Sequence, residues 1–519
     1  MAVAVSQLSS KRATVLLKPR LLTQIAVRSS ASNPQSLYET RKHNGSPVKP
    51  FEELPGTPLG FFRNMVFNIR NVLNGEFNKP FNMLSRFKKE YGPIWRQQFG
   101  SIVFIMLTDV IDIEKVCRHE GKYPRRVEFS PWVLARSDLK EDMGVLLSEG
   151  ADWHRNRVAL SKRMLRPKQV ATYTDPVNDV ITDMLAKIER TRTSANENNL
   201  VPDIENILFS WALDSACSVI LSKKMGLLDD KPHPEAHRFI QSVHDVFSTT
   251  LLLFVVPATI QKFLRTPIWR KHVTAWDNIF TTAKKLIDVR VDEIVKLGAT
   301  GDVDFLTYMV GRKSLSSSEI YADATELLMA AVDTTSSAFI WTLYNVARHP
   351  QVQEALYEEV NRVIPKGKIP THEDINKLPY LKAILKETTR LYPPVVNVSR
   401  ILETDIVVSG YNVPAGTALN MAIWMVARDP QYFDDPDKFK PERWLREENE
   451  SFNGFKLLPF GFGPRMCIGK RLAELEIHLA LARISQKYIL ESTTDVEATM
   501  TMLQIPDRPL NLRFIDRGT

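Results

Sequence analysis

Cysteine is scarce in this chain. Its 519 residues include only three cysteines, Cys117, Cys217 and Cys467, and no two of them form a CxxC pair. Disulfide-stabilised secreted domains carry more cysteines than this, and structural zinc sites need closely spaced ligands. The sequence therefore indicates neither a disulfide framework nor a structural zinc site, and it favours a reducing compartment.

Long apolar runs are also lacking. A membrane-spanning helix needs about 18 or more consecutive apolar residues, whereas the best run, Leu251 to Val256, is short and stops at Pro257. We therefore expect a mature protein that is soluble or peripheral to a membrane. The run at 251–256, with Trp269 beyond it, could enter a membrane surface, although a core helix fits it equally well.

Acidic residues are absent from the first 38 positions, which carry five basic residues and many Ser and Ala. This balance is typical of a mitochondrial transit peptide. A secretory signal or a membrane anchor needs an uncharged apolar run, which the basic residues interrupt here. We expect residues 1–38 to be a transit peptide and residues 39–54 to be a polar link.

The composition is that of a globular enzyme with a large core. Hydrophobic residues make up 44% and charged residues 25% of the chain, and the length alone leaves one or two domains open. The stretch from Leu54 to Pro58 contains two prolines and a glycine and cannot be helical, so a folded domain should begin near residue 55. The net charge of +8 favours an anionic partner, but no basic motif interleaved with aromatics supports nucleic acid.

Helical spacing dominates the hydrophobic pattern. Apolar residues recur at helical intervals from about residue 80 to residue 360, whereas strand-like runs such as 102–107 and 405–408 are short and few. The pattern predicts a mainly α fold with a small β region. It shows no internal repeat.

A long helix is predicted between Ser316 and His349. Ser316 and Glu319 have the spacing of a capping box, and Pro350 follows the end of the pattern. The middle of this helix, residues 327–340, is apolar nearly all the way round. We therefore expect it to pass through the interior of the protein.

This helix carries Asp333 and Thr334 into the predicted interior. Burying a carboxylate and a hydroxyl is costly unless they have hydrogen-bond partners. Either they satisfy each other and the local backbone, or they serve a reaction. The helix alone leaves both interpretations open.

The segment from Phe460 to Glu474 combines glycines, a lone cysteine and apolar residues, and a helical stretch begins near Lys470. Glycines let a backbone approach something flat and large. A thiolate near a helix N-terminus is stabilised as an anion, which a soft metal ligand requires. Cys467 could instead be an ordinary core cysteine, but that interpretation leaves the glycines and Arg465 unexplained.

These residues resemble the haem-ligand signature of the cytochrome P-450 superfamily, which is matched at every fixed position by Phe460, Gly463, Arg465, Cys467 and Gly469. Three further family signatures occur in the expected order: Trp153-His-Arg-Asn-Arg157, Glu387-Thr-Thr-Arg390 and Pro441-Glu-Arg443-Trp. The resemblance covers residues 55–519 and implies a single domain with the cytochrome P-450 fold. Haem b would lie between the long central helix and the loop of Cys467, the axial ligand of its iron.

The resemblance implies a role for the other matching residues. Donors to the haem propionates would be Trp153, Arg157, Arg400 and Arg465. Glu387 would form a buried charged network with Arg390 and Arg443, and this network would be structural. Asp333 and Thr334 would relay protons through water to bound dioxygen.

The resemblance also points to an electron donor. Lys382 and Lys386 lie four apart on one helix, away from its apolar stripe, and their spacing alone is that of an ordinary solvated pair. They align, however, with lysines by which mitochondrial family members dock an acidic [2Fe–2S] ferredoxin of the adrenodoxin type, and Lys470 and Arg471 would extend this basic face. Electrons would pass from NADPH through ferredoxin reductase and the ferredoxin. The enzyme would then lie on the matrix side, peripheral to the inner mitochondrial membrane.

Within the mitochondrial branch, the chain is most similar to the vitamin D 24-hydroxylase group and to related steroid and sterol hydroxylases. The similarity is carried by the stretches 330–335, 378–383, 471–480 and 123–126. It implies O₂-dependent hydroxylation of an apolar secosteroid, sterol or steroid, in a cavity lined by Trp132, Ala330, Val395, Val396 and Leu503. A mitochondrial enzyme that oxidises xenobiotics is the alternative. A haem-binding sensor or carrier without turnover would need neither Asp333 and Thr334 nor the lysine pair.

Overall fold

The computed structural model describes residues 42–43, 46–76, 80–100, 102–194, 198–230, 234–297, 304–312, 314–445 and 453–518. The chain divides into two compact units, Met1–Val48 and Lys49–Thr519. In the first unit, the described residues form the antiparallel pair β1 (Lys42–His43) and β2 (Ser46–Pro47). The predicted transit peptide at 1–38 lies outside the described residues.

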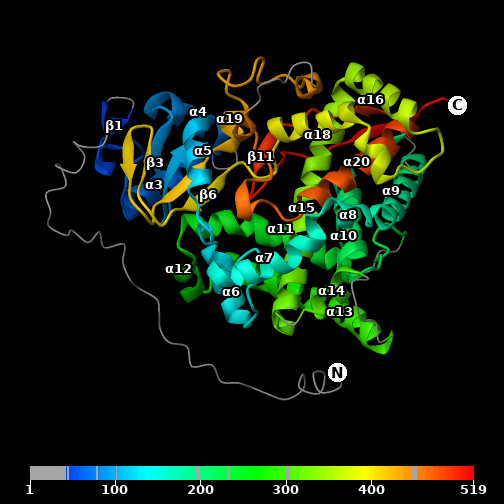
Figure 1. Cartoon of the computed structure of the whole chain (residues 1–519), viewed down its shortest axis with the longest axis horizontal. Helices are drawn as coiled ribbons and strands as arrows, with labels where there is room; N and C mark the ends of the chain where they lie inside the picture. Colours follow the sequence, from blue (N-terminus) through cyan, green and yellow to red (C-terminus); the bar gives the residue numbers. More distant parts are fainter. Residues whose placement is uncertain are drawn as a thin grey trace. The chain divides into compact units, whose positions relative to one another are not determined.

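Helices make up most of the second unit (Figure 1). Those before residue 311 are α3 (Phe61–Leu73), α4 (Pro80–Tyr91), α5 (Val110–Arg118), α6 (Ser130–Leu139), α7 (Gly150–Met164), α8 (Pro167–Ala171), α9 (Thr174–Ser194), α10 (Ile204–Ile220), α11 (Pro234–Val255), α12 (Ala258–Phe263), α13 (Pro267–Leu297) and α14 (Phe305–Val310). They are followed by α15 (Ser317–Arg348), α16 (Pro350–Val363), α17 (His372–Asn376), α18 (Pro379–Leu391), α19 (Ile423–Ala427) and α20 (Lys470–Lys487). Short 3₁₀ turns are η2 (Phe51–Glu53), η3 (Pro441–Trp444), η5 (Gly454–Lys456) and η6 (Gly463–Arg465).

The β structure is small, as the sequence predicts. The largest sheet has the order β3 (Ile94–Phe99), β4 (Ile102–Leu107), β9 (Ala418–Met421) and β6 (Val398–Ile401), with only β4 and β9 parallel. The smaller sheets are β10 (Tyr488–Ser492), β13 (Leu512–Asp516) and β5 (Leu200–Val201); β11 (Ala498–Met500) and β12 (Gln504–Pro506); and β7 (Ile406–Val408) and β8 (Tyr411–Val413). The strands β4 and β7 confirm the two strand-like runs. The mainly α fold class is confirmed as well.

The predicted central helix is confirmed as α15. Ser316 accepts from the amide of Glu319, and the Glu319 side chain accepts from the amide of Ser316, which completes the capping box. The helix ends at Arg348, two residues before Pro350. It contacts α10, α11, α13, α18 and α20, which surround it in the second unit (Figure 1).

The hydrophobic core has two main parts. The larger one lies among the helices, and a smaller one packs against the four-stranded sheet. Each fully buried Leu or Phe in these cores contributes about 1.5–3 kcal/mol of transfer free energy. The packing fixes α15, α20 and the sheet relative to one another, and these elements carry the candidate site.

The apolar run at 251–256 contributes to the core, although Leu252 is exposed, so its contact with a membrane stays a prediction. Leu253, Val255 and Trp269 are buried, because they face inward from α11 and α13. None of the helices in the described part of the chain combines the length and the hydrophobicity that crossing a bilayer requires.

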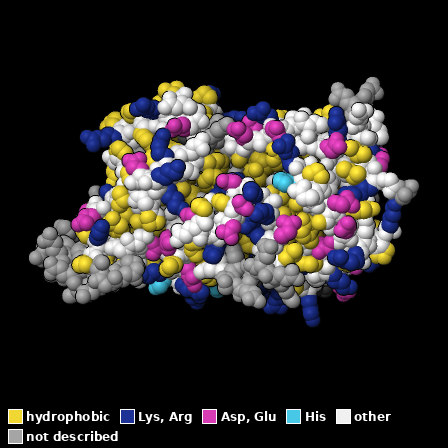
Figure 2. Space-filling model, turned by 90° about the horizontal axis from the view of Figure 1, so that it is seen from above, with side chains coloured by type: hydrophobic (Ala, Val, Ile, Leu, Met, Phe, Trp, Pro, Cys, Tyr) yellow, Lys and Arg dark blue, Asp and Glu magenta, His cyan; other side chains and the backbone are white. Residues whose placement is uncertain are grey.

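Surface charges are mixed rather than separated. On the face seen from above in Figure 2, Lys and Arg side chains are interspersed with Asp and Glu, with hydrophobic side chains between them. The net positive charge therefore does not form one continuous patch on this face. A basic docking surface has to be sought in a particular cluster of residues.

Candidate active site

The loop of Cys467 requires glycine at two positions. Gly461 and Gly463 have φ angles of +71° and +68°, which side-chain-bearing residues rarely adopt. A Cβ on Gly463 would also lie 1.7 Å from Oε1 of Glu120. The carboxylate of Glu120 thus lies directly against the loop. Packing within the protein therefore requires glycine at position 463, apart from any bound cofactor.

The thiol of Cys467 is accessible, yet it lies deep in the protein. Its backbone N–H donates to the carbonyl of Phe460 at 2.8 Å. Burial raises the pKa of Cys467, while the amides of Gly469 and Lys470 and the charge of Arg157 oppose that rise. Amide donors at the start of α20 favour the anion. An accessible sulfur with such donors is suited to ligate a soft metal centre.

Gly469 leaves open the space beside the sulfur of Cys467. Its φ angle is −81°, which any residue can adopt, and an added Cβ would lie 3.8 Å from Sγ of Cys467, an ordinary contact. The packing of the chain itself therefore does not require glycine here. The missing side chain keeps the space beside the sulfur open, as a haem plane would need.

A cluster of arginines lies beside this loop. Arg157 donates to the carbonyl of Met466 at 2.7 Å, and Arg400, from β6, donates to that of Phe462 at 3.0 Å. Arg465 donates to Glu149 at 2.7 Å. Arg157 and Arg400 therefore hold the loop by its carbonyl oxygens, and Arg465 connects it to Glu149.

Arg126 is a further member of this cluster that the sequence analysis did not single out. Its Nε is buried with no hydrogen-bond partner among the described residues. Burial, together with the charge of Arg126, lowers the pKa of Arg157 to about 10 and that of Arg465 to about 9. It lies in the stretch 123–126, which the sequence analysis used only as a point of similarity to the vitamin D 24-hydroxylase group.

The cluster carries more positive than negative charge. Its carboxylates are Glu120, which pairs with Arg400, and Glu149, which pairs with Arg465. Burial raises the pKa of both carboxyl groups. Four guanidinium groups facing two carboxylates suit a ligand with two acidic groups of its own, and haem carries two propionates. The residues present thus fit the cofactor.

Trp153 joins this cluster from α7. Its ring is buried, and the guanidinium carbon of Arg465 lies 3.9 Å from the ring centroid. Phe460 lies under the ammonium group of Lys470, 5.7 Å from its ring centroid. The structure therefore brings all the sequence-predicted haem-binding residues to the surroundings of one loop.

A single face of α15 is accessible in the middle of the helix. Between Ala322 and Ala347, only Ala330, Ala331 and Thr334 are not buried. These positions follow the helical repeat and lie on one side. The hydroxyl of Thr334 donates to the carbonyl of Ala330 at 2.6 Å, so its polar group is satisfied while it faces the accessible side.

Asp333 does not share that face. It is buried, and its Oδ1 lies 3.0 Å from Nε2 of His244 on α11. The two atoms form an ion pair when the ring is protonated. Burial raises the pKa of Asp333, and His244 opposes that rise. The sequence did not predict His244 as the partner of Asp333, because the two residues are far apart in the chain and no local pattern connects them.

Glu387 is fully buried and lies at the centre of a largely buried network. It accepts from Nε of Arg390 and from Nε of Arg443, both at 2.9 Å, and from the indole of Trp444 at 2.9 Å. Arg390 also donates to the carbonyls of Ala427 and Pro436. The network connects α18 to η3 and to the loop before it, which agrees with a structural role.

The four basic residues predicted to face a redox partner gather around a carboxylate that had not been singled out. Burial raises the pKa of Glu474, and the charges that oppose this rise belong to Lys470, Arg471, Lys382 and Lys386. Lys386 is exposed, with its Nζ 5.0 Å from the ring centroid of Trp444. Burial, followed by the charge of Lys470, lowers the pKa of Lys386.

The residues predicted to line a substrate cavity differ in accessibility. Ala330 is half-buried and Val395 is exposed, whereas Val396 and Leu503 are buried. Trp132 is buried too, and its indole donates to Thr250 at 2.7 Å. Ala330 and Val395 are thus the two that a ligand could touch without rearrangement.

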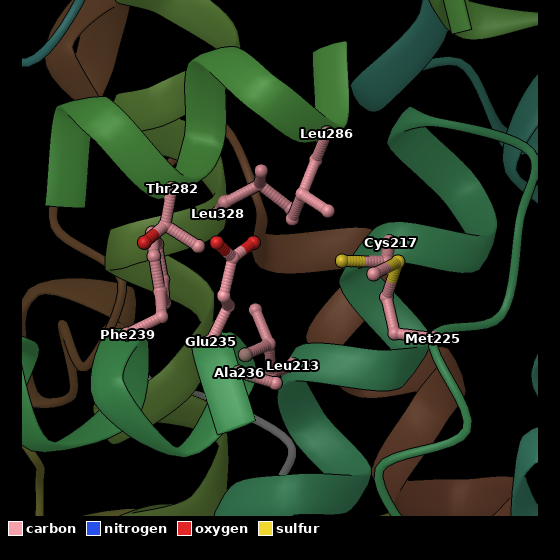
Figure 3. A pocket seen from close by; sticks show the side chains of 9 residues that line it. All are labelled: Leu213, Cys217, Met225, Glu235, Ala236, Phe239, Thr282, Leu286 and Leu328. Atoms are coloured by element: carbon pink, nitrogen blue, oxygen red, sulfur yellow. The ribbon is translucent and has the colours of Figure 1, made fainter. Parts of the chain in front are cut away.

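A separate small cavity lies among α10, α11, α13 and α15. Figure 3 shows Cys217, Met225 and Glu235 among the side chains that line it. None of the predicted substrate-lining residues borders this cavity. Burial raises the pKa of Cys217, which keeps this thiol protonated and inert.

Comparison with known proteins agrees with this geometry. The family model for cytochrome P-450 matches residues 56–514. The mitochondrial sterol 26-hydroxylase of Rattus norvegicus is 35% identical over 83% of this chain and 83% of its own length. The mitochondrial 1,25-dihydroxyvitamin D(3) 24-hydroxylase of Mus musculus is 37% identical over 85% of both chains.

The mitochondrial sterol 26-hydroxylase of Homo sapiens is similarly related, with 35% identity over 83% of both chains. These relatives share a mitochondrial location by name. The family match spans most of the chain and includes the loop of Cys467, the arginine cluster and α15. The chain therefore belongs to the cytochrome P-450 family and is a haem-thiolate monooxygenase.

Proposed function

We propose that the protein is a mitochondrial monooxygenase that hydroxylates an apolar secosteroid, sterol or steroid with electrons from a [2Fe–2S] ferredoxin. One observation carries the proposal. The accessible thiol of Cys467, at the start of α20, and the accessible face of α15 at Ala330, Ala331 and Thr334 are the two surfaces that a haem-thiolate reaction requires.

Each group of residues has a task in this reaction. Haem b, when bound, supplies the activation of O₂ and the transfer of one oxygen atom to the substrate, with water as the second product. Cys467 would ligate its iron, and Trp153, Arg157, Arg400 and Arg465, together with Arg126, would bind its propionates. Phe460 and Gly469 shape the space beside the sulfur.

Proton delivery is assigned to Thr334 and Asp333. The Thr334 hydroxyl is accessible and held by its bond to Ala330, so it can orient a water or pass on a proton. Asp333 is its neighbour in the chain but faces α11. A sensor or carrier has no use for either group, which favours turnover over simple haem binding.

Electron delivery is assigned to the basic cluster of Lys382, Lys386, Lys470 and Arg471. Their shared influence on Glu474 places all four within electrostatic reach of one group. An acidic ferredoxin, reduced by NADPH through ferredoxin reductase, has the complementary charge. Such docking needs no membrane-spanning helix, and it suits a position on the matrix side of the inner membrane.

Two exposed apolar segments can contact that membrane. On α3, the exposed side chains Phe62, Val66, Ile69 and Leu73 form one stripe at helical spacing, and Phe263 and Leu264 are exposed at the end of α12. Phe263→Ser should reduce sedimentation with vesicles of anionic lipid, whereas Ile369→Ser, at an exposed apolar residue in a loop, should leave it unchanged.

The substrate class is supported by the relatives, whose names specify a sterol and a vitamin D compound. The test is a spectral titration of the purified ferric holoenzyme with a hydroxylated secosteroid, with a sterol and with unrelated xenobiotics. A saturable shift from low to high spin with the secosteroid or the sterol supports the proposal. A shift with xenobiotics alone would favour the detoxifying alternative.

A pocket variant sharpens this titration. Val395 is exposed, and a Phe at this position adds bulk without disturbing a buried contact. Val395→Phe should weaken substrate binding by about tenfold, since an overfilled apolar pocket costs roughly 1–3 kcal/mol. Ile369→Phe, at an exposed apolar position in a loop, is the matched control and should bind as the wild type does.

A further inference from the structure

A buried acid and a partly accessible base connect α11 to α15. Nε2 of His244 lies 3.0 Å from Oδ1 of Asp333, and the two helices are in contact. The His244 side chain is 31% accessible, whereas that of Asp333 is 10% accessible. The imidazole of His244 is therefore in contact with solvent, whereas the carboxylate of Asp333 is almost shielded from it.

The surroundings of the pair leave Asp333 dependent on His244. His244 is the one charged group found to oppose the effect of burial on Asp333 among the described residues. A buried carboxylate without a counter-charge takes up a proton and becomes neutral. The ionised form of Asp333, which can accept a proton and pass it on, thus depends on this one imidazole.

The other groups facing His244 come from three elements. Phe209 of α10 packs edge-on against the ring, with centroids 4.5 Å apart, and fixes its plane. Asp245, the next residue of α11, adds a second negative charge, but it is paired with Lys271 of α13 at 3.0 Å. Burial lowers the pKa of His244, and the carboxylate of Asp333, with Asp245, raises it overall above its ordinary value.

We infer that His244 is a positioning residue for Asp333, which it holds ionised, turned toward α11 and connected to solvent. The inference rests on the proposed function, in which Asp333 takes part in proton delivery. A proton taken from water by the ring passes to Oδ1 of Asp333, and the ring returns to its neutral form. Asp333 then releases this proton toward the reaction and is ionised again, which restores the starting state, so charge and protons balance.

The first test measures the pair without turnover. Histidine labelled with ¹³C is introduced into the holoenzyme, which is studied by NMR in its diamagnetic ferrous, carbon-monoxide-bound form. The His244 signal is the one lost in His244→Gln. Its pKa should lie above that of an ordinary histidine and should fall in Asp333→Asn. An unchanged midpoint in Asp333→Asn would overturn the inference.

The second test measures coupling, the fraction of NADPH electrons recovered in product, across a pH series. His244→Gln should lower it about tenfold and should change the shape of its pH profile, because the group that takes protons from water is lost. His244→Lys keeps a cation near Asp333 but does not titrate near neutrality, so it should retain the fold without restoring the profile.

His237 provides the matched control, since it is an exposed histidine two turns earlier on α11. His237→Gln should match the wild type in coupling and in pH profile. Wild-type coupling and pH profile in His244→Gln would overturn the positioning role. If the wild type makes no product while the NMR shift is present, the proposed function fails and the His244–Asp333 pair stands.

Discussion

The guanidinium group of Arg465 stacks on the indole ring of Trp153, with 3.9 Å between its central carbon and the ring centroid. The two residues are more than 300 positions apart in the chain, on α7 and on the turn before Cys467. Their contact joins the helix that carries Arg157 to the loop that carries the thiol. It also holds the Arg465 charge within the arginine cluster.

This relationship predicts the effect of removing the charge. Arg465→Gln should speed haem loss from the holoenzyme about tenfold, because hydrogen bonds to charged groups contribute about 1.5–3 kcal/mol. Transfer of haem to excess apomyoglobin measures the rate. Arg118→Gln, at an exposed arginine paired with Glu114 on the surface, is the control, and equal rates for the two variants would refute the assignment of Arg465.

Gly463 should tolerate no side chain. Gly463→Ala forces a residue with a Cβ into a positive φ, which costs about 1–2 kcal/mol, and it also displaces Glu120 from Arg400. Gly416 has a φ of +81° but open space around it, so Gly416→Ala isolates the backbone cost. The temperature of half-inactivation of the holoenzyme should fall more for Gly463→Ala than for Gly416→Ala. An equal fall would mean that Glu120 moves aside freely.

Thr334 should matter for coupling rather than for stability. Thr334→Ala should lower the fraction of electrons recovered in product by roughly tenfold and raise the peroxide released. Thr342→Ala removes a hydroxyl with the same bond to the carbonyl four residues earlier, but at a fully buried position. It should lower stability without uncoupling the reaction. Coupling that is unchanged in Thr334→Ala would count against the relay.

Lys382 and Lys386 should govern the affinity for ferredoxin. Replacing both by Gln should weaken binding about tenfold at low salt, and the difference should shrink as salt screens the charges. Surface plasmon resonance with an adrenodoxin-type ferredoxin measures it. Lys223 and Lys224 are adjacent surface lysines with acidic partners of their own. The double Gln variant at 223 and 224 should bind as the wild type does, and a loss as large as at 382 and 386 would indicate only general attraction.

The sequence predicted the elements that local patterns specify. The capping box at Ser316 and Glu319 and the proline at 350 gave the limits of α15, because these signals act through neighbouring residues. The strands at 102–107 and 406–408 followed from short apolar runs. The family signature indicated which loop carries the thiol.

The rest depends on contacts between distant segments. His244 and Asp333 are on different helices, and no local pattern around either residue predicts their contact. The role of Glu474 could not be predicted from its own neighbourhood in the sequence, because two of the four cations that act on it lie on another helix. The same holds for Arg126. The run at 251–256 left a core helix and a membrane contact open for a related reason, since hydrophobicity alone does not show which side of a helix faces the core.

The role of Cys467 as the thiolate ligand is tested most directly by the absorption spectrum of the ferrous, carbon-monoxide-bound protein. The wild type, Cys117→Ser and Cys217→Ser should all show the red-shifted Soret band of a thiolate-ligated haem, since the latter two cysteines are buried elsewhere. Cys467→His should bind haem without that band. A Cys467→His protein that keeps the band, or a wild type that lacks it, would contradict the assignment of Cys467 as the iron ligand.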